Sequence, residues 1–162
     1  MKKNTSKKPW LSEKEKSKLI FTAVIAFSVV ALDQIAKLLA VNFIELGESF
    51  AVIKNIFHLT IVHNYGAAFG IFQHTVPVLI WISVIAIGFI IYYYDRIPFK
   101  KSVILFISLL IGGTISNLID RIRAGYVIDF IDFRVWPAFN IADAAITIGA
   151  VCLAVYLLRK KQ

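Results

Sequence analysis

Two long segments without charge constrain the fold of this chain more than any other feature of its sequence. Residues 75–94 are 20 consecutive positions without a charged side chain, and residues 102–119 are 18 more. A helix needs about 20 apolar residues to cross a bilayer, so each segment is long enough. Two further segments are mostly apolar. We therefore predict one membrane domain over residues 19–158, an all-α bundle of four transmembrane helices at about 19–43, 75–94, 102–121 and 139–158.

The positive charge of the chain lies outside these segments. Its formal net charge of +8 could indicate a nucleic-acid partner. No basic-aromatic RNA-binding motif or helix-turn-helix is present, so we expect no nucleic acid. Thirteen of the 18 basic residues lie in residues 1–18, 95–101 and 159–162. Because basic residues favour the cytoplasmic side, residues 1–18 are predicted to be a cytoplasmic leader and 159–162 a cytoplasmic tail, with the loops at about 44–74 and 122–138 outside.

The first outer loop contains a pattern typical of strands. Between residues 47 and 63, a turn-prone Lys54-Asn55 pair precedes alternating apolar and polar residues at 57–62. Alternation of this kind favours a β-hairpin, which we place at the membrane surface. Asn64-Tyr65-Gly66 ends the pattern, and residues 67–72 are predicted to form a short helix.

Polar residues interrupt three of the predicted helices at one depth. Counting 1.5 Å per residue from the basic flanks puts Asp33 about 22 Å up the first helix and Asn117 about 24 Å up the third. Asp120 lies about 28 Å up the third helix and Asp143 about 24 Å up the fourth, in a hydrocarbon core about 30 Å thick. Ionisable groups are costly inside a membrane, so this cluster is predicted to be a functional site near the outer surface.

Helical spacing places these side chains on shared faces. Asp33 and Lys37 are four residues apart, as are Asn117 and Arg121, so each pair lies on one side of its helix. Asn140 and Asp143 are three residues apart and also lie on one face of their helix. The alternative interpretation is that these groups form structural ion pairs and hydrogen bonds that hold the bundle together.

The residue types in the cluster restrict its chemistry. All three histidines lie in the first outer loop and no G-x-S-x-G motif is present, which argues against a serine hydrolase. No H-E-x-x-H motif or phosphate-binding glycine loop is present, so we expect no metal and no cofactor. A pair of carboxylates remains, one taking a proton from water while the other donates a hydrogen bond. Asp143 is its first member, and Asp129, Asp132 and Asp120 compete for the second role on spacing alone.

Five sequence blocks match a known family, in the order in which that family has them. They are residues 33–37, 64–70, 113–121, 127–130 and 139–143, which include Asp-Gln-Ile-Ala-Lys, Asn-Tyr-Gly-Ala-Ala-Phe-Gly, Val-Ile-Asp-Phe and Phe-Asn-Ile-Ala-Asp. On these residues the chain resembles the lipoprotein signal peptidases, also called signal peptidase II. These are bacterial membrane aspartyl proteases that remove signal peptides from lipid-modified prolipoproteins.

The resemblance implies an aspartyl endopeptidase, a hydrolase, that cleaves before the diacylglyceryl-modified cysteine of its substrate. It implies a small extracytoplasmic β-cradle and a short surface helix beside the four transmembrane helices. The resemblance implies that Asp129 is the partner of Asp143 in the catalytic dyad. Asp132 is then expected to be a solvated loop residue. The residues that it implies for substrate binding or support are Asp33, Lys37, Asn64, Gly66, Asn117, Asp120, Arg121 and Asn140.

The same resemblance implies partners and a location. The partners are lipid-modified prolipoproteins and membrane lipid, and the protein is expected to be a monomer and a target of globomycin-type inhibitors. Family members need no metal or organic cofactor. The expected location is the bacterial cytoplasmic (inner) membrane, crossed several times, with both termini in the cytoplasm and the active site at the outer face.

Two other functions compete with this one. A small proton-coupled transporter would use Asp33, Asp120 and Asp143 as relay groups. It would need polar residues across the whole membrane depth, and the inner halves of these helices have almost none. A non-catalytic assembly subunit would use the polar residues to hold helices together, so Asn substitutions would impair folding before activity.

Overall fold

The computed structural model describes residues 11–66 and 75–160. The elements are α1 (Glu13–Phe43), β1 (Ser49–Ile53), β2 (Phe57–Asn64), α2 (Val76–Tyr92), the short 3₁₀ helix η2 (Tyr94–Arg96), α3 (Lys101–Ala124), β3 (Val127–Asp132) and α4 (Ile141–Lys160). A helix lies over each of the four predicted transmembrane segments. By length and composition α1, α3 and α4 could each cross a membrane, whereas α2 is a shorter apolar helix.

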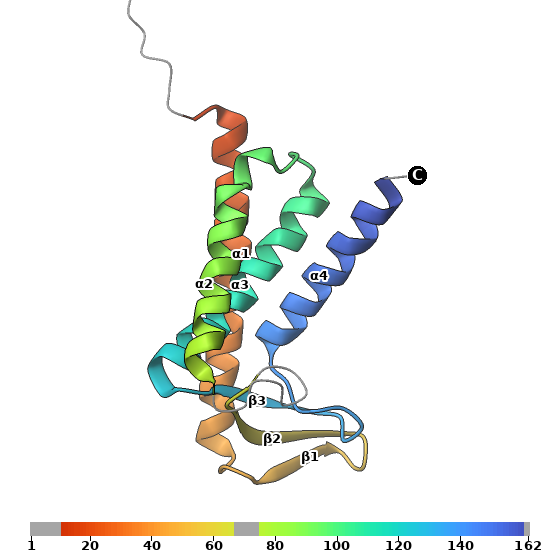
Figure 1. Cartoon of the computed structure of the whole chain (residues 1–162). Helices are drawn as coiled ribbons and strands as arrows, with labels where there is room; N and C mark the ends of the chain where they lie inside the picture. Colours follow the sequence, from red (N-terminus) through yellow and green to blue (C-terminus); the bar gives the residue numbers. More distant parts are fainter. Residues whose placement is uncertain (1–10, 67–74, 161–162) are drawn as a thin grey trace, which may run out of the picture.

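The helices stand side by side and the sheet lies at one end of them (Figure 1). The central helix is α3, which packs against α1, α2 and α4. The first turn of α1 and the last turn of α4 lie at the end opposite the sheet. Large apolar side chains face outward, including Phe27, Ile85 and Ile148, which are 72%, 66% and 54% exposed. Apolar outer faces suit contact with lipid, as expected of a protein that crosses a membrane more than once.

Two glycines of α3 allow its neighbours to approach closely. A Cβ added at Gly112 would lie 2.8 Å from the carbonyl oxygen of Ala26 on α1. A Cβ at Gly113 would overlap the carbonyl oxygen of Ala142 on α4. Small residues at such crossings let two helix backbones pack against each other. The N-terminal turn of α4 is therefore held directly against the middle of α3.

The three strands form one antiparallel sheet in the order β1-β2-β3. The predicted hairpin is confirmed as β1 and β2, with Asn55 at a φ of 65° in the turn. The third strand, β3, was not predicted. It pairs with β2 so that Asp129 lies opposite Val62. Because Asn64 follows Val62 by two residues on the same face, β3 brings Asp129 diagonally beside Asn64.

A small hydrophobic cluster attaches the sheet to the end of α1. Its buried members are Ala40 and Ile44 of α1, Ile61 of β2 and Phe130 of β3. Side chains alternate between the two faces of a strand, so Phe130 points into this cluster while Asp129 points to the opposite face. The apolar contacts of one face of β3 thus fix the position of the acidic residue on the other.

The first helix begins earlier than predicted. We expected a cytoplasmic leader through residue 18, but α1 already begins at Glu13. Ser12 and Glu15 form a capping box, in which each side chain accepts a hydrogen bond from the backbone N–H of the other. Such a box satisfies two of the free N–H groups at a helix start and stabilises the added turns. Residues 1–10 and 161–162 lie outside the described residues, as does the short helix predicted at 67–72.

The expectation that Asp132 is a solvated loop residue was wrong. It is the last residue of β3 and is 8% exposed. Its Oδ2 accepts a hydrogen bond from Thr60 Oγ1 at 2.9 Å, and its Oδ1 accepts one from the backbone N–H of Arg134 at 2.7 Å. Burial acts to raise the pKa of Asp132, but these hydrogen bonds and the charge of Arg134 outweigh it, and the pKa lies below its usual value.

Candidate active site

Asp129 lies where the sheet meets the helices and is 1% exposed. Both its oxygens accept hydrogen bonds from neutral amides: Asn64 Nδ2 donates to Oδ2 at 2.8 Å and Asn140 Nδ2 donates to Oδ1 at 2.7 Å. Burial and the negative charge of Asp143 raise the pKa of Asp129 to about 7, against the opposing effect of the amides and the charge of Lys37. This carboxyl group therefore gains or loses its proton near neutral pH.

Asp143 stands in the first turn of α4 and is held by the start of that helix. Its N–H donates to Asn140 Oδ1 at 2.8 Å, and the N–H of Asn140 donates to Asp143 Oδ2 at 3.3 Å. This reciprocal pairing has the form of a capping box. Asn117 Nδ2 of α3 donates to Asp143 Oδ1 at 2.7 Å. Because Asn140 also binds Asp129, it joins the two aspartates into one site.

Asn117 connects Asp143 to a buried group of charges, called here the ion cluster: Asp33, Lys37 and Asp120. The Oδ1 of Asn117 accepts a hydrogen bond from Lys37 Nζ at 3.2 Å. The same Nζ lies 2.6 Å from Asp33 Oδ2 and 2.6 Å from Asp120 Oδ2. Asp33 is 0% exposed and Lys37 2% exposed. Buried charges of this kind need close partners to offset the loss of hydration, and here each carboxylate has the ammonium group.

Two polar side chains to which the sequence analysis gave no role complete the ion cluster. Ser116 Oγ donates to Asp33 Oδ2 at 2.7 Å, and Gln34 Nε2 donates to Asp120 Oδ1 at 2.7 Å. The N–H of Ala142 donates to Asp33 Oδ1 at 2.9 Å, which ties the start of α4 to α1. Their positions in the sequence could have indicated these roles, because Ser116 directly precedes Asn117 and Gln34 directly follows Asp33.

Arg121 extends from α3 toward the segment that follows β2. Its Nη2 donates to the carbonyl oxygen of Gly66 at 3.3 Å, and the N–H of Gly66 donates to Asn64 Oδ1 at 2.9 Å. Within residues 11–66 and 75–160, the buried Nε of Arg121 has no hydrogen-bond partner. A buried N–H donor normally has a partner, so this group is suited to bind an acceptor from a ligand.

Hydrogen bonds connect all ten predicted site residues. They are Asp33, Lys37, Asn64, Gly66, Asn117, Asp120, Arg121, Asp129, Asn140 and Asp143. Asp132, which spacing alone also allowed as the second carboxylate of the pair, contacts Thr60 and Arg134 instead. Among the described residues, no group of three or more His, Cys, Asp and Glu side chains could hold a metal ion. Asp129 and Asp143 both form hydrogen bonds with Asn140. Two carboxyl groups held close together in this way can share a proton, and acid–base hydrolysis needs such a pair.

Comparisons with known proteins identify the family. The family model described as signal peptidase (SPase) II matches residues 25–159. A lipoprotein signal peptidase of Halothermothrix orenii is 45% identical, over 86% of this chain and 96% of its own. One from Moorella thermoacetica is 41% identical, over 83% of this chain and 91% of its own. A solved structure described as a bacterial membrane enzyme is 33% identical and has a TM-score of 0.83, over 87% of this chain and 89% of that one. The chain therefore belongs to the signal peptidase II family of membrane proteases.

Proposed function

We propose that Asp129 and Asp143 are the catalytic dyad of an aspartyl endopeptidase that removes signal peptides from diacylglyceryl-modified prolipoproteins. The ionised aspartate takes a proton from a water molecule, which attacks the carbonyl carbon of the peptide bond before the lipidated cysteine. The protonated aspartate donates a hydrogen bond to the carbonyl oxygen and stabilises the negative charge that develops there. Proton transfer to the leaving amine then completes the cleavage.

One observation carries this proposal. Asn140 contacts both carboxyl groups, and in the described part of the chain no cation lies within ion-pair distance of either. Two such carboxyl groups close together cannot both ionise readily, so one proton is shared. The pKa of about 7 for Asp129 supports this sharing at neutral pH.

The other residues of the network act by positioning. Asn64 and Asn140 orient Asp129, and Asn117 orients Asp143. We propose that the ion cluster holds Asn117 and the start of α4 in place through Lys37 Nζ. Arg121, with Gly66 beside it, is proposed to bind backbone carbonyl groups of the substrate, because its Nε donor is unused among the described residues.

The membrane arrangement is also proposed. All four helices would span the membrane as one domain, since α2 runs along α3 and its 17 residues are about 25 Å long. The aromatic residues 92–94 at its end suit the membrane surface. The basic ends would lie in the cytoplasm, and the sheet would form a β-cradle at the outer face of the inner membrane. There a monomer would meet the acyl chains of its substrate, and a globomycin-type inhibitor would bind at the dyad.

Cleavage of a lipidated prolipoprotein by purified variants tests the dyad. Asp129→Asn and Asp143→Asn should each lower turnover by at least about a thousandfold, because each removes one role in proton transfer. Asp132→Asn is the matched control, since it changes another buried aspartate of β3 outside the network. It should cleave like the unaltered protein. Normal turnover by a folded Asp129 or Asp143 variant would rule out the dyad.

A second pair of substrates tests the substrate class. The same prolipoprotein is prepared with and without the diacylglyceryl group on its cysteine. The proposal predicts rapid cleavage of the lipidated form only. Equal cleavage of both forms would contradict the requirement for lipid while leaving the dyad in place.

A further inference from the structure

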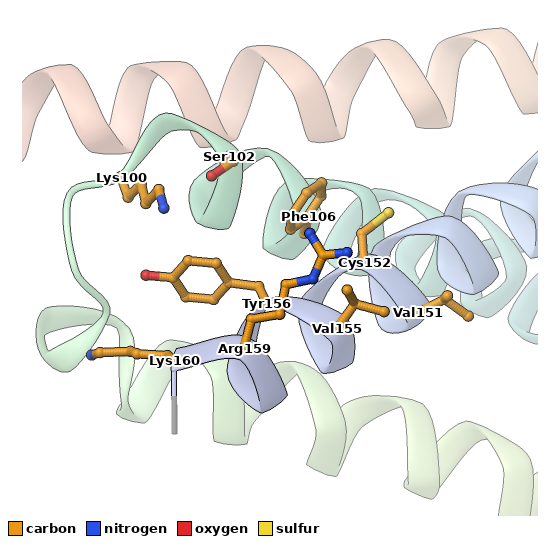
Figure 2. A pocket seen from close by; sticks show the side chains of 9 residues that line it. All are labelled: Lys100, Ser102, Phe106, Val151, Cys152, Val155, Tyr156, Arg159 and Lys160. Carbon is orange, nitrogen blue, oxygen red and sulfur yellow. The ribbon is translucent and has the colours of Figure 1, made fainter. Parts of the chain in front are cut away.

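α3 and α4 separate at the end of the bundle away from the dyad. Their last close crossing is at Gly149, where an added Cβ would lie 2.6 Å from the carbonyl oxygen of Phe106. Beyond this crossing α4 leans away from the other helices (Figure 1). A pocket of about 560 Å³ lies between the first turns of α3 and the last turns of α4. Figure 2 shows the side chains that line it.

The pocket is apolar along the helices and basic at their ends. Phe106 and Val155 are apolar lining residues, and the basic lining residues Lys100, Arg159 and Lys160 come from chain positions near the helix termini. In Figure 2 the Arg159 side chain turns back along the pocket toward Phe106. In the part of the chain that the structure describes, no carboxylate lines the pocket or pairs with these three cations. Within residues 11–66 and 75–160, no carboxylate therefore neutralises their charge.

We propose that this pocket binds an anionic phospholipid, with the headgroup phosphate between Lys100 and Arg159 and one acyl chain along Phe106 and Val155. The guanidinium group of arginine forms two parallel hydrogen bonds to phosphate oxygens, and basic pockets between transmembrane helices bind anionic headgroups. The volume lies within the range of about 300–1,000 Å³ for small-molecule sites. The site is separate from the catalytic proposal, because it lies at the opposite end of the helices.

A simpler interpretation is that these cations only mark the membrane boundary, as basic residues commonly do. Lys14 and Lys16, near the start of α1, provide the comparison. Lys14 Nζ lies 5.3 Å from the centre of the Phe99 ring, and Lys16 pairs with Glu13 at 2.6 Å. Neither lines the pocket. The start of α1 lies at the same end of the bundle as the end of α4 (Figure 1), so Lys14 and Lys16 share any general attraction for an anionic surface without sharing the pocket.

Cys152 allows occupancy of the pocket to be measured. It lines the pocket, and it is the only cysteine of the chain, so a maleimide reagent has no second thiol to modify. The full-length protein in detergent is labelled with added phosphatidylglycerol or phosphatidylcholine that carry the same acyl chains. Phosphatidylglycerol should slow labelling at Cys152 at least about fivefold, and phosphatidylcholine should not. Equal slowing by both lipids, or by neither, would overturn the proposal without any variant.

Two double variants then locate the headgroup. Lys100→Gln with Arg159→Gln should raise the phosphatidylglycerol concentration needed for protection by about twenty-five-fold, because each charge contributes roughly a factor of five. Lys14→Gln with Lys16→Gln removes the same charge from the same end and should leave that concentration unchanged. An equal loss of phosphatidylglycerol protection in both double variants would show general attraction to the surface and would overturn the proposed binding site. Equal protection by soluble glycerol phosphate would show that no acyl chain is bound and overturn the lipid as occupant.

Discussion

The ion cluster and the dyad contain the same acidic residue type within one network but are held in opposite ways. In the ion cluster, Lys37 Nζ lies 2.6 Å from a carboxylate oxygen on each side. The carboxyl groups of the dyad receive hydrogen bonds from the neutral amides of Asn64, Asn117 and Asn140 instead. The negative charges of the ion cluster are balanced by the ammonium group of Lys37, whereas the amides orient the carboxyl groups of the dyad without neutralising them.

We propose that this difference separates the structural role of the ion cluster from the chemical role of the dyad. A carboxylate paired with an ammonium group stays ionised and fixes geometry, while two carboxyl groups without a cation keep a proton available for transfer. The two groups are still coupled, because Asp33 accepts a hydrogen bond from the N–H of Ala142 and Lys37 donates one to Asn117. The ion cluster thus holds the helix that carries Asp143.

Removing the cation should have the largest effect on stability. Lys37→Met leaves Asp33 and Asp120 buried without their counter-charge, and the unfolding free energy should fall by about 3–5 kcal/mol. Reversible unfolding in mixed detergent micelles measures this loss. Adding Asp33→Asn and Asp120→Asn removes the unpaired charges and should restore part of the stability.

Lys54→Met is the matched control for that loss. Lys54 is exposed in the turn between β1 and β2, so its substitution should leave the unfolding free energy unchanged. If Lys37→Met were as stable as this control, the ion cluster would not be structural and the contrast with the dyad would fail.

A substitution at the crossing of α3 and α4 should have the next largest effect. The Cβ of Gly113→Ala would overlap the carbonyl oxygen of Ala142, and the required shift of α4 should cost about 3 kcal/mol. The same shift moves Asp143 away from Asn117, so turnover should fall as well. Gly88→Ala on α2 is the control, because a Cβ there meets no atom within 4 Å. Equal stability of the two variants would show that the close approach does not position the dyad.

The pH dependence of stability distinguishes the dyad from the ion cluster. The pKa of Asp129 is about 7 in the folded protein against an ordinary value of 3.8. Between these values the folded state keeps a proton that the unfolded chain releases, so this contribution to stability is lost as pH rises toward 7. From pH 5.5 to pH 7 the loss should be roughly 2 kcal/mol. Melting curves of the unaltered protein should show this loss of stability, and those of Asp129→Asn should show a smaller one. Parallel curves would contradict the shared proton.

The sequence was most informative where a signal is local. Charge-free runs located the helices, alternation located the β1–β2 hairpin, and counting from the basic flanks brought Asp33, Asn117 and Asp143 to one level. Their level agrees with the hydrogen bonds that join these helices, such as Asn117 to Asp143. Periodicity and depth carry this information because each depends on neighbouring positions along one helix or strand.

Features that depend on distant contacts were not predictable. The strand β3 is defined by its pairing with β2, and the burial of Asp132 follows from that pairing and from the Thr60 hydrogen bond. Spacing alone also could not choose Asp129, since only the sheet register brings it to Asn64. The start of α1 is different, because the Ser12 to Glu15 spacing is a local sequence signal of a capping box.

The location of the proposed shared proton can be measured directly. Infrared difference spectra between the unaltered protein and single aspartate variants, recorded below pH 7, show whether each carboxyl group carries a proton. We predict that Asp129→Asn removes or shifts a band of a protonated carboxyl group, while Asp33→Asn and Asp120→Asn remove only bands of ionised carboxylates. A protonated band that depends on Asp33 or Asp120 and is unchanged in Asp129→Asn would contradict the division between the dyad and the ion cluster.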